Sequence, residues 1–519
     1  MDALNISELV SHHAHYRPND SAVVFSNQRL NWHQLEQRSN HLAHALRRAG
    51  VGHGDRVVTV LANSMELLYI YWACARLGAV AVPLSPLLMS SGLQTLLADA
   101  DPKLIFVSAA TQALCTEAKA RLASTAIQVL VGESDPKETT PHYVSFDEFM
   151  GEPPTEKIHA TVFPDDLFNI MYTSGTTGLP KGIALTHRIR AHYATLMANA
   201  WRMDAQSVVL HSGALVFNGA FVTMMPALLV GCRFVLHAQF DPISFIETVE
   251  REAVTHTMLV PSQIAAILDA PKFDAGRLAS LKMLVSLGAP LPLSQKERLE
   301  THLPGRFHEL YGLTEGFVTI LDREDALRKR GSVGVPPPFS SLRIVREDGS
   351  DANASEIGEI AGRSPLLMPG YYGRPELTAQ TVRDGWLFTG DLGYVDADGY
   401  LFLVDRKKDM IDSGGVKIYP RDIEEVMARH PDVAEAVVFG VPHEKWGETP
   451  LAAVQLRPRA DGSAASADEL RSWINARVAA RYQQVSAVSI VVNFPRNAAG
   501  KILKRELRDP HWVGQERLI

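Results

Sequence analysis

The most informative segment of this chain is a ten-residue run, Thr173-Ser174-Gly175-Thr176-Thr177-Gly178-Leu179-Pro180-Lys181-Gly182. It follows an apolar stretch at residues 167–172, whose composition favours a β-strand. Three glycines let the backbone approach an anion closely, and four hydroxyl groups add hydrogen-bond donors. Lys181 adds a positive charge, so the run predicts a loop that binds a polyphosphate. The phosphate loop of GTPases is excluded, because the pattern G-x-x-x-x-G-K-S/T occurs nowhere in the chain.

Four more motifs follow in order along the chain. They are Tyr311-Gly312-Leu313-Thr314-Glu315, Thr389-Gly390-Asp391, Asp405-Arg406-Lys407-Lys408-Asp409 and Pro495-Arg496-Asn497-Ala498-Ala499-Gly500-Lys501. With the first run, these motifs resemble the adenylate-forming (AMP-binding) superfamily, which includes acyl-CoA synthetases, aryl-CoA ligases, luciferases and peptide-synthetase adenylation domains. The resemblance covers essentially the whole chain. It implies an enzyme that joins a carboxylic acid to ATP as an acyl-adenylate, releases pyrophosphate, and then lets a thiol displace AMP.

The resemblance also implies which residues bind ATP or AMP. They are Thr173, Ser174, Gly175, Thr176, Thr177, Gly178 and Lys181 of the first run, Gly288, Ala289 and Pro290 of a later turn, Tyr311, Gly312 and Thr314 of the second motif, and Asp391 and Arg406. An ordinary turn remains the alternative at residues 288–290. The assignment of Asp391 has a physical basis, because one carboxylate can accept hydrogen bonds from two adjacent ribose hydroxyls. Arg406 is then a second contact to ribose or phosphate.

Metal binding and catalysis are expected at four residues. A hard carboxylate oxygen such as that of Glu315 suits Mg²⁺, which neutralises the phosphates of ATP. The resemblance implies that Thr314 and Glu315 act on the phosphates and the metal, with Thr173 as a further metal contact. It assigns catalysis to Lys501, whose cation bridges the attacking carboxylate and the α-phosphate. Losing such a donor typically costs roughly 3–4 kcal/mol of transition-state stabilisation.

Two domains are expected, residues 1–405 for nucleotide and acid binding and residues 406–519 for the catalytic lysine. The family alternates two orientations of its C-terminal domain about a hinge, which corresponds to Lys408 here. One orientation brings the lysine to the site, and the other opens a route for the thiol of CoA. A few residues at the end of an element can absorb such a rotation. Gly415, Lys417 and Trp446 are expected along the CoA route, although simple packing is an equal alternative for Trp446.

The acid pocket is predicted from residues 214–232, which carry no charged side chain. The stretch nears the length of a membrane span, but Asn218, Gly219 and Pro226 interrupt it, so a buried helix beside the pocket is favoured. Phe217, Asn218, Gly288 and Gly312 are the expected pocket residues. Asn218 stands where many relatives have histidine, which weakens any inference about the substrate from that position.

These residues favour an acid that is apolar near its carboxylate. A medium- or long-chain fatty acid is expected first, with an aryl or phenylpropenoic acid as the alternative. An enzyme that loads the acyl group onto a carrier protein also remains open. The expected small molecules are therefore the acid, ATP, Mg²⁺ and CoA.

The fold class follows from the hydrophobic pattern along the chain. Residues 32–49 and 67–77 have helical periodicity, and residues 56–61, 80–83, 103–108, 127–132 and 232–237 resemble buried strands. Repeated βα units imply mostly parallel sheets covered by helices. Residues 331–400 suggest a β-rich subdomain. Residues 420–430 and 467–480 favour helices, and 433–439 and 451–456 favour strands, so the chain should be α/β with a small, mobile α+β C-terminal domain.

Composition narrows the class of protein further. The 519 residues carry a formal charge of −7, so no overall basic field is available to hold nucleic acid. Only three cysteines occur, far apart, which fits a reducing compartment. The N-terminus lacks a basic segment followed by an apolar one, so we expect neither a signal peptide nor an integral membrane span, and a cytoplasmic enzyme. The oligomeric state is left open, a homodimer included.

Overall fold

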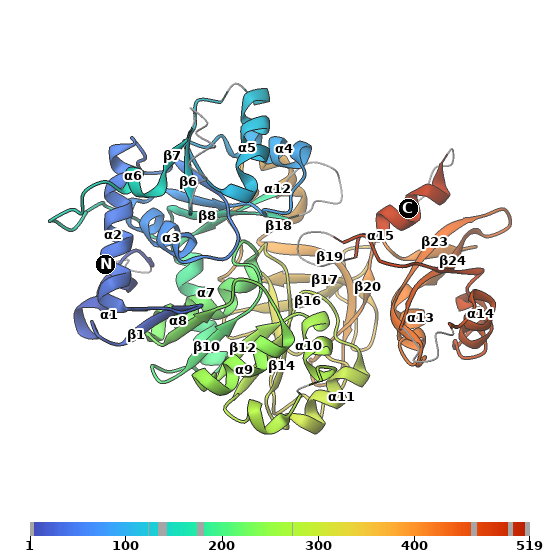
Figure 1. Cartoon of the computed structure of the whole chain (residues 1–519). Coiled ribbons are helices and arrows are strands. Elements are labelled where there is room, and N and C mark those ends of the chain that lie inside the picture. The colour runs from blue at the N-terminus through green and yellow to red at the C-terminus, as the bar shows by residue number, and fades with distance from the viewer. Residues whose placement is uncertain are drawn as a thin grey trace.

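A large unit and a small unit make up the molecule. The computed structural model describes residues 5–122, 124–132, 143–173, 181–271, 273–457, 464–496 and 502–513. The small unit, which contains α13, α14, β23 and β24, lies to one side of the large one (Figure 1). A large α/β unit with a β-rich part, followed by a small α+β unit, confirms the expected fold class.

The first half of the large unit is built on a seven-stranded sheet in the order β7-β6-β5-β3-β4-β8-β9. All of its pairings are parallel except that of β8 with β9. The strands are β3 (Arg56–Val60), β4 (Val80–Pro83), β5 (Leu104–Ser108), β6 (Ile127–Val131), β7 (Val144–Ser145), β8 (Leu167–Thr173) and β9 (Lys181–Thr186). The helices of this half are α1 (Leu9–Tyr16), α2 (Trp32–Arg48), α3 (Met65–Leu77), α4 (Ser90–Ala100), α5 (Ala109–Leu122) and α6 (Phe146–Met150).

The second half is built on an eight-stranded sheet in the order β15-β14-β13-β12-β10-β11-β1-β2. The six central strands are parallel, and β2 and β15 are antiparallel edges. The strands are β1 (Ser21–Phe25), β2 (Gln28–Asn31), β10 (Val208–His211), β11 (Arg233–Leu236), β12 (His256–Leu259), β13 (Met283–Ser286), β14 (Phe307–Gly312) and β15 (Val318–Leu321). Its helices are α7 (His187–Ala200), α8 (Phe221–Val230), α9 (Pro242–Glu252), α10 (Pro261–Leu268) and α11 (Leu293–His302).

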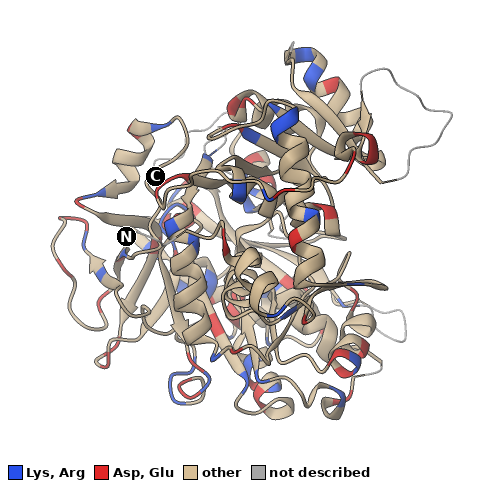
Figure 2. Ribbon diagram, turned by 90° about the vertical axis from the view of Figure 1, so that its left-hand side faces the viewer, with Lys and Arg blue, Asp and Glu red and all other residues tan. Residues whose placement is uncertain are grey.

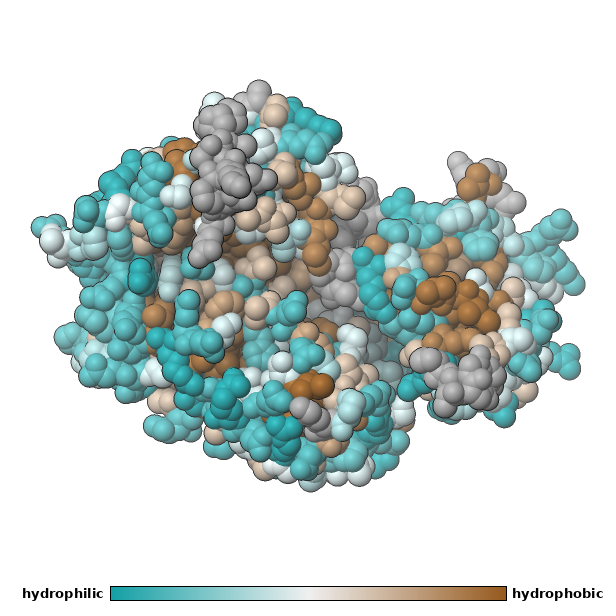
Figure 3. All heavy atoms as spheres, viewed as in Figure 1, coloured by the Kyte–Doolittle hydropathy of each residue, from teal (hydrophilic) through white to brown (hydrophobic). Residues whose placement is uncertain are grey.

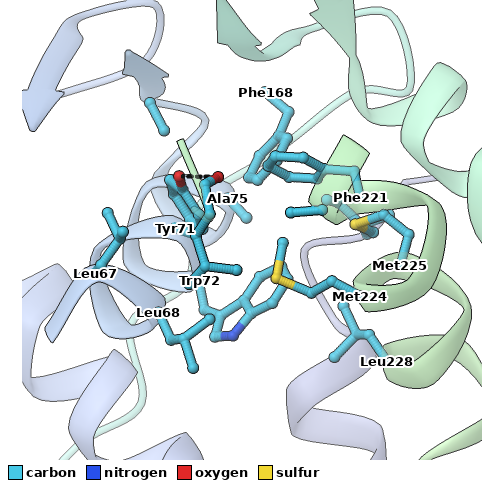
Figure 4. Close-up of a cluster of buried hydrophobic side chains, with 14 of the residues drawn as sticks. Leu67, Leu68, Tyr71, Trp72, Ala75, Phe168, Phe221, Met224, Met225 and Leu228 are labelled. Atoms are coloured by element: carbon cyan, nitrogen blue, oxygen red, sulfur yellow. Dashed lines mark hydrogen bonds between the residues drawn. The ribbon is translucent and has the colours of Figure 1, made fainter. Parts of the chain in front are cut away.

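The largest core joins α3, α7 and α8 to strands of both sheets. Side chains of α3 such as Trp72 face Phe221 and Met224 of α8 (Figure 4). The expected buried helix in residues 214–232 is thus confirmed as α8. Its internal Pro226 cannot donate to the carbonyl of Val222, and the indole Nε1 of Trp201 donates to that carbonyl at 2.9 Å instead. No helix in the described part of the chain is both long enough and apolar enough to cross a bilayer.

The β-rich part of the large unit is a five-stranded sheet in the order β16-β17-β19-β18, with β20 paired to β19. Its elements are β16 (Ser341–Val345), β17 (Gly358–Arg363), α12 (Pro375–Thr381), β18 (Val382–Arg383), β19 (Trp386–Val395) and β20 (Leu401–Arg406). The expectation of a β-rich subdomain in residues 331–400 is confirmed. Strand β20 leads directly into the small unit.

The small unit has a five-stranded sheet with helices against it. Its elements are β21 (Ile411–Ser413), β22 (Val416–Ile418), α13 (Pro420–Met427), β23 (Val433–His443), β24 (Gly447–Leu456), α14 (Ala467–Asn475), β25 (Ala487–Ile490) and α15 (Lys504–Arg508). The expected helix at 467–480 was too long, since α14 ends at Asn475.

Apolar side chains gather on part of this unit in Figure 3. In Figure 2, basic and acidic residues are intermixed over the ribbon, and no large area in this view carries charges of one sign alone.

Candidate active site

The motifs converge at the carboxyl edge of the eight-stranded sheet. Neighbouring parallel strands β13 and β14 end at Ser286 and Gly312, so residues 288–290 and 313–315 extend from the same edge. Ligands of open α/β sheets bind outside the carboxyl ends of the strands. Gly288, Ala289 and Pro290 are exposed and Thr314 is half-buried, so a ligand can reach them. The structure therefore brings these predicted residues together.

Asp391 is held by two neighbours at this edge. The hydroxyl of Tyr311 donates to Asp391 Oδ2 at 2.8 Å, and Arg406 Nε lies 3.5 Å from Asp391 Oδ1. Burial raises the pKa of Tyr311 well above its ordinary value, so the phenol stays a donor at neutral pH. Asp391 and Arg406 are also register partners of β19 and β20. A carboxylate fixed in this way keeps lone pairs for two further donors, as a pair of ribose hydroxyls requires.

Glu315 is connected to Lys181 through Tyr371, which the sequence reasoning missed. The hydroxyl of Tyr371 donates to Glu315 Oε1 at 2.8 Å, and Lys181 Nζ lies 5.7 Å from the centroid of the Tyr371 ring. Burial raises the pKa of Tyr371, so it too remains protonated. The backbone N–H of Tyr372 donates to Gly182 O at 2.7 Å, which fixes this segment against β9. The only signal in the sequence was an aromatic pair after Gly370.

Gly316 explains how Glu315 is held in place. Its φ is +110°, and a Cβ at this position would lie 2.0 Å from the carbonyl oxygen of Leu366. Only glycine permits that approach at that backbone angle. The close contact brings the N–H of Met368 within 2.8 Å of Glu315 O. The segment that carries Tyr371 is therefore packed directly against the backbone of the YGLTE motif.

The carboxylate of Glu315 fits the chemistry of a magnesium ligand. Magnesium usually keeps several waters and is bound by one or two carboxylates together with substrate phosphates. Within the described residues, no group of three or more His, Cys, Asp or Glu side chains could form a complete protein cage. Glu315 Oε1 is occupied by Tyr371, and its Oε2 receives no hydrogen bond from the described chain. When bound, Mg²⁺ would neutralise phosphate charge beside this oxygen.

Several predicted residues lie outside the described residues. They are Ser174, Gly175, Thr176, Thr177 and Gly178 of the first run, and Lys501. The flanks of that run are described, since Thr173 and Lys181 stand opposite each other in the antiparallel pair of β8 and β9. Lys181 is thereby placed beside the ring of Tyr371, whose hydroxyl donates to Glu315. The predicted metal contact at Thr173 lies at the end of β8 and is half-buried.

The expected acid-pocket residues lie in two adjoining segments. A Cβ on Gly219 would lie 3.1 Å from Leu287 Cδ1, so the segment with Phe217 and Asn218 packs against the segment that leads to Gly288. Phe217 and Asn218 are half-buried, and Gly312 is exposed at the end of β14. Asn218 accepts a hydrogen bond at 2.9 Å from Arg190, a buried residue that the sequence did not single out. The predicted pocket wall is therefore polar at this point.

The residues expected along the CoA route gather in one corner of the small unit. Strands β21 and β24 pair at Ser413 and Gly447, and the N–H of Gly414 donates to the carbonyl of Trp446 at 2.7 Å. Gly415 is exposed, and Trp446 is 46% exposed. Lys417 forms an ion pair with Glu347 of the large unit. This contact joins the corner to the β16–β17 connection.

The junction between the units carries several charges. Burial, with a smaller contribution from the charge of Glu424, raises the pKa of Asp405 to about 6, although Lys504 opposes that shift. The N–H of Arg421 donates to Asp405 Oδ2 at 3.0 Å, and Lys504 Nζ pairs with Glu424 at 2.7 Å. Burial also lowers the pKa of Lys408, the expected hinge residue.

Comparison with known proteins agrees with this geometry. Residues 10–372 match the AMP-binding enzyme family, and residues 422–501 match the C-terminal domain of AMP-binding enzymes. The feruloyl-CoA synthase of Amycolatopsis sp is 36% identical over 505 residues, covering 95% of this chain and 96% of that protein. The indoleacetate–CoA ligase of Aromatoleum aromaticum is 34% identical over 511 residues, covering 97% and 98%.

Two further relatives extend the comparison. The long-chain-fatty-acid–CoA ligase of Bacillus subtilis is 32% identical over 523 residues, covering 94% of this chain and 91% of that protein. The crystal structure of ATP-bound MatB from Rhodopseudomonas palustris has a TM-score of 0.87 at 27% identity, covering 98% of this chain and 99% of that one. The similarity therefore spans both units and includes ligases for aromatic and for aliphatic acids.

Proposed function

This chain belongs to the AMP-binding enzyme family and is an AMP-forming acid–thiol ligase; we propose that its thiol is CoA and that its acid carries an aromatic ring. The relatives at 36% and 34% identity are named for feruloyl-CoA and indoleacetate, both aromatic, and support this class of acid. The half-buried amide of Asn218 in the expected pocket wall supports it as well, since a purely aliphatic tail offers no partner to an amide.

The first half-reaction forms the acyl-adenylate. A carboxylate oxygen of the acid attacks the α-phosphorus of ATP, the bond from that phosphorus to the bridging oxygen breaks, and pyrophosphate leaves. Asp391, fixed by Tyr311, accepts hydrogen bonds from the ribose, and Arg406 holds ribose or phosphate. Glu315, fixed by Tyr371, would hold Mg²⁺ against the phosphates. Lys501 bridges the attacking carboxylate and the α-phosphate, where a donor is most valuable in the transition state.

The second half-reaction transfers the acyl group to CoA. The sulfur attacks the acyl carbon, the carbon–oxygen bond to AMP breaks, and the thiol proton passes to solvent. We place residues 1–405 in the nucleotide and acid domain and residues 406–519 in the mobile domain, with the hinge at Lys408. Rotation about this hinge would withdraw Lys501 and bring Gly415, Lys417 and Trp446 to the thiol route.

The observation that carries this proposal is the pair of tethered carboxylates. Asp391 and Glu315 come from different segments, and each accepts a hydrogen bond from the hydroxyl of a tyrosine, Tyr311 or Tyr371. One suits a ribose and the other a metal–phosphate group. That division of roles is what adenylation of an acid requires.

A panel of acids tests the proposal. Pyrophosphate release should be measured with ATP, Mg²⁺ and benzoic, arylacetic, phenylpropenoic and aliphatic acids, with and without CoA, and the thioester identified by mass spectrometry. We expect pyrophosphate release and CoA thioesters with aromatic acids. If no acid releases pyrophosphate, the proposal fails. Transfer to a carrier protein in place of CoA would contradict the assigned acceptor.

A fatty acid remains the second candidate substrate. The uncharged residues 214–232 and the relative from Bacillus subtilis, which is named for long-chain fatty acids, favour it. Aliphatic acids of 8 to about 16 carbons belong in the same panel. Higher kcat/KM for these acids than for every aromatic acid would replace the aromatic assignment while leaving the ligase assignment intact.

A further inference from the structure

Arg190 is a fully buried cation in the middle of the large unit. It lies on α7, and its side chain has 0% exposure. Its Nε donates to Asn169 Oδ1 of β8 at 3.2 Å, and its Nη1 donates to Asn218 Oδ1 at 2.9 Å. Its Nη2 has no hydrogen-bond partner in the described structure. Arg190 therefore connects the strand that leads to the phosphate-loop run with the segment expected to line the acid pocket.

The environment of Arg190 keeps its charge without a counter-ion. Burial lowers its pKa, but only to about 10, so the guanidinium is protonated at neutral pH. Its central carbon lies 3.9 Å from the centroid of the Phe221 ring and 5.0 Å from that of Tyr193, where the faces of the rings stabilise a cation. No carboxylate among the described residues pairs with it. An apolar side chain would fill this space without the free-energy cost of desolvating a charge. Packing alone therefore does not explain the presence of an arginine here.

The orientation of Asn218 follows from that charge. A guanidinium only donates hydrogen bonds, so the amide oxygen of Asn218 must face Arg190. Asn218 Nδ2 then donates one hydrogen to the hydroxyl of Tyr193 at 3.1 Å. Flipping the amide would place its NH2 group against the cation. Since an amide nitrogen carries two hydrogens, one donor of Asn218 remains for a ligand.

We propose that Arg190 is a positioning residue that fixes Asn218 as a hydrogen-bond donor in the acid pocket, and that the acid carries a neutral oxygen acceptor on its ring. A hydroxyl, methoxy or carbonyl oxygen has this chemistry. The inference rests on the proposed function, because it assumes that the segment with Phe217 and Asn218 contacts the acid. Asn218 is half-buried, and a Cβ on its neighbour Gly219 would lie 3.1 Å from Leu287, the residue before Gly288, so the amide lies near the turn where we expect the acid.

A second carboxylate on the acid is a poorer fit than a neutral oxygen. The guanidinium of Arg190 is fully covered, so a ligand would meet the neutral amide of Asn218 and not the charge itself. Desolvating a carboxylate against one amide donor is costly, whereas a neutral oxygen loses little and gains one hydrogen bond. The buried charge acts by polarising and orienting the amide.

The test uses pairs of acids that differ by one oxygen. Purified enzyme is assayed by pyrophosphate release with 3-phenylpropenoic acid, its 2-, 3- and 4-hydroxy derivatives, and a dicarboxylic analogue. For the wild type we expect one hydroxylated isomer to be favoured about tenfold or more in kcat/KM, which is the scale of one well-placed hydrogen bond. Asn218→Leu and Arg190→Met should reduce this preference to within about twofold. Most of the loss should appear in KM for the hydroxylated acid.

Conservative and control variants separate positioning from a structural role. Arg190→Lys keeps the charge and should recover part of the preference, whereas Arg188→Met removes an arginine of the same helix that pairs with Asp165 and should leave it unchanged. If Arg190→Met does not fold, Asn218→Leu and Tyr193→Phe decide the question. The first removes the amide and the second removes the hydroxyl to which the amide donates, and both keep the buried charge.

Three outcomes of the assay with aromatic acids would overturn the inference. They are a wild type that favours no hydroxylated isomer, an Asn218→Leu variant with an unchanged preference, and a preference for the dicarboxylic acid. Turnover of aliphatic acids alone would also overturn it while leaving the ligase assignment standing. Absence of pyrophosphate release with every acid is a different result, which contradicts the proposed function itself.

Discussion

The polar groups inside the large unit differ from those at its contact with the small unit. Most of the former are neutral and buried, whereas the latter are charged. In the large unit, His187, His211, His256 and His308 are buried, and burial lowers the pKa of each to about 4, so these rings are neutral at pH 7. Its buried Arg190 is covered by aromatic rings and amides. The small unit instead meets the large one through charged groups around Asp405 and through an ion pair of Lys417.

This difference indicates which contacts can change during turnover. Four apolar clusters among the described residues hold the sheets of the large unit, whose close packing resists continuous deformation. Each apolar cluster of the small unit lies within that unit alone. Partly exposed ion pairs contribute little to stability because water replaces them readily. This difference is what the proposed rotation requires, in which the large unit keeps the proposed nucleotide and acid residues fixed while the small unit changes its orientation.

The largest effects are expected from two variants of the small unit, Lys501→Ala and Lys417→Ala. They test whether this unit changes its orientation while the large unit does not. Lys501→Ala should lower acyl-adenylate formation by roughly 100- to 1,000-fold, because in the proposed function it removes a donor that acts in the transition state. It should leave thioester formation from supplied acyl-adenylate within about threefold of the wild type. Lys417→Ala should have the opposite effect, slowing thioester formation and sparing adenylation. Pyrophosphate release and thioester formation are measured separately in single turnovers.

The reciprocal pattern is what distinguishes two orientations from one. If both variants slow both half-reactions equally, the small unit acts in a single arrangement, and the hinge at Lys408 is contradicted. Lys445→Ala is a suitable control, because Lys445 Nζ lies over the Trp446 ring at 4.4 Å in the same corner, without an ion pair to the large unit among the described contacts.

A smaller effect is expected in the large unit from Tyr371→Phe. The change removes the donor to Glu315 Oε1 and keeps the ring beside Lys181. We expect kcat/KM for adenylation to fall about tenfold, the scale of one hydrogen bond to a charged group. The concentration of Mg²⁺ needed for half-maximal rate should rise, since Glu315 is less well oriented. Adenylation is followed by pyrophosphate release across a magnesium titration.

Tyr372→Phe is the matched control for that change. Tyr372 is the next residue, and its tie to β9 is made by its backbone N–H, which the substitution keeps. It should behave like the wild type. An unchanged magnesium requirement in Tyr371→Phe would contradict the role given to Glu315 in holding the metal.

The sequence predicted most elements of the fold and about half of the described site. Strand β4 matched its expected bounds, and the buried α8 followed from an uncharged stretch, because burial of apolar residues is a local property of the sequence. Helix α14 ends at Asn475 although Val478, four residues after the buried Ile474, still packs against the same core, so the apolar spacing predicted too long a helix. Asp391, Arg406 and Glu315 were singled out as candidates because they lie in short motifs.

Tyr371 and Arg190 could not be predicted in the same way. Tyr371 is 56 residues from Glu315, and Arg190 is 28 residues from Asn218, so only the fold brings them together. An arginine in a helix is usually solvated, and nothing in its neighbours indicates that this one is buried under Phe221. Long-range pairs between single residues carry no periodicity or motif that a sequence could display.

A test of the junction is the pH dependence of Asp405→Asn. The folded pKa of about 6 lies above the ordinary value, so the carboxyl contributes most to stability below about pH 4, and this contribution is lost as the pH rises through 6. Asparagine stays neutral at every pH. The unfolding temperature of the variant relative to the wild type should therefore rise by a few degrees between pH 4.5 and pH 7.5. Differential scanning fluorimetry over this range measures it.

The informative quantity in that experiment is how the difference in unfolding temperature between Asp405→Asn and the wild type changes with pH. Asp405 accepts from the N–H groups of Arg406 and Arg421 with different oxygens, and asparagine can keep only one of these bonds. The variant can thus be less stable at every pH and still show the expected slope. If the unfolding temperatures of the two proteins change with pH in parallel, the junction does not bury a charged carboxyl. The difference drawn between the two units would then lose this support.

The smallest effect is expected from Glu347→Gln at the exposed contact between the units. The substitution keeps the size of the side chain and removes the charge that pairs with Lys417, where Glu347 is 80% and Lys417 is 46% exposed. Because such a pair contributes little, the unfolding temperature should stay within about one degree. Without this ion pair, Lys417 can move with the small unit when that unit rotates. The rate of thioester formation should therefore rise up to about twofold at low ionic strength and match that of the wild type at high salt. A slower rate would show that the pair supports the thiol-accepting orientation and not the one described.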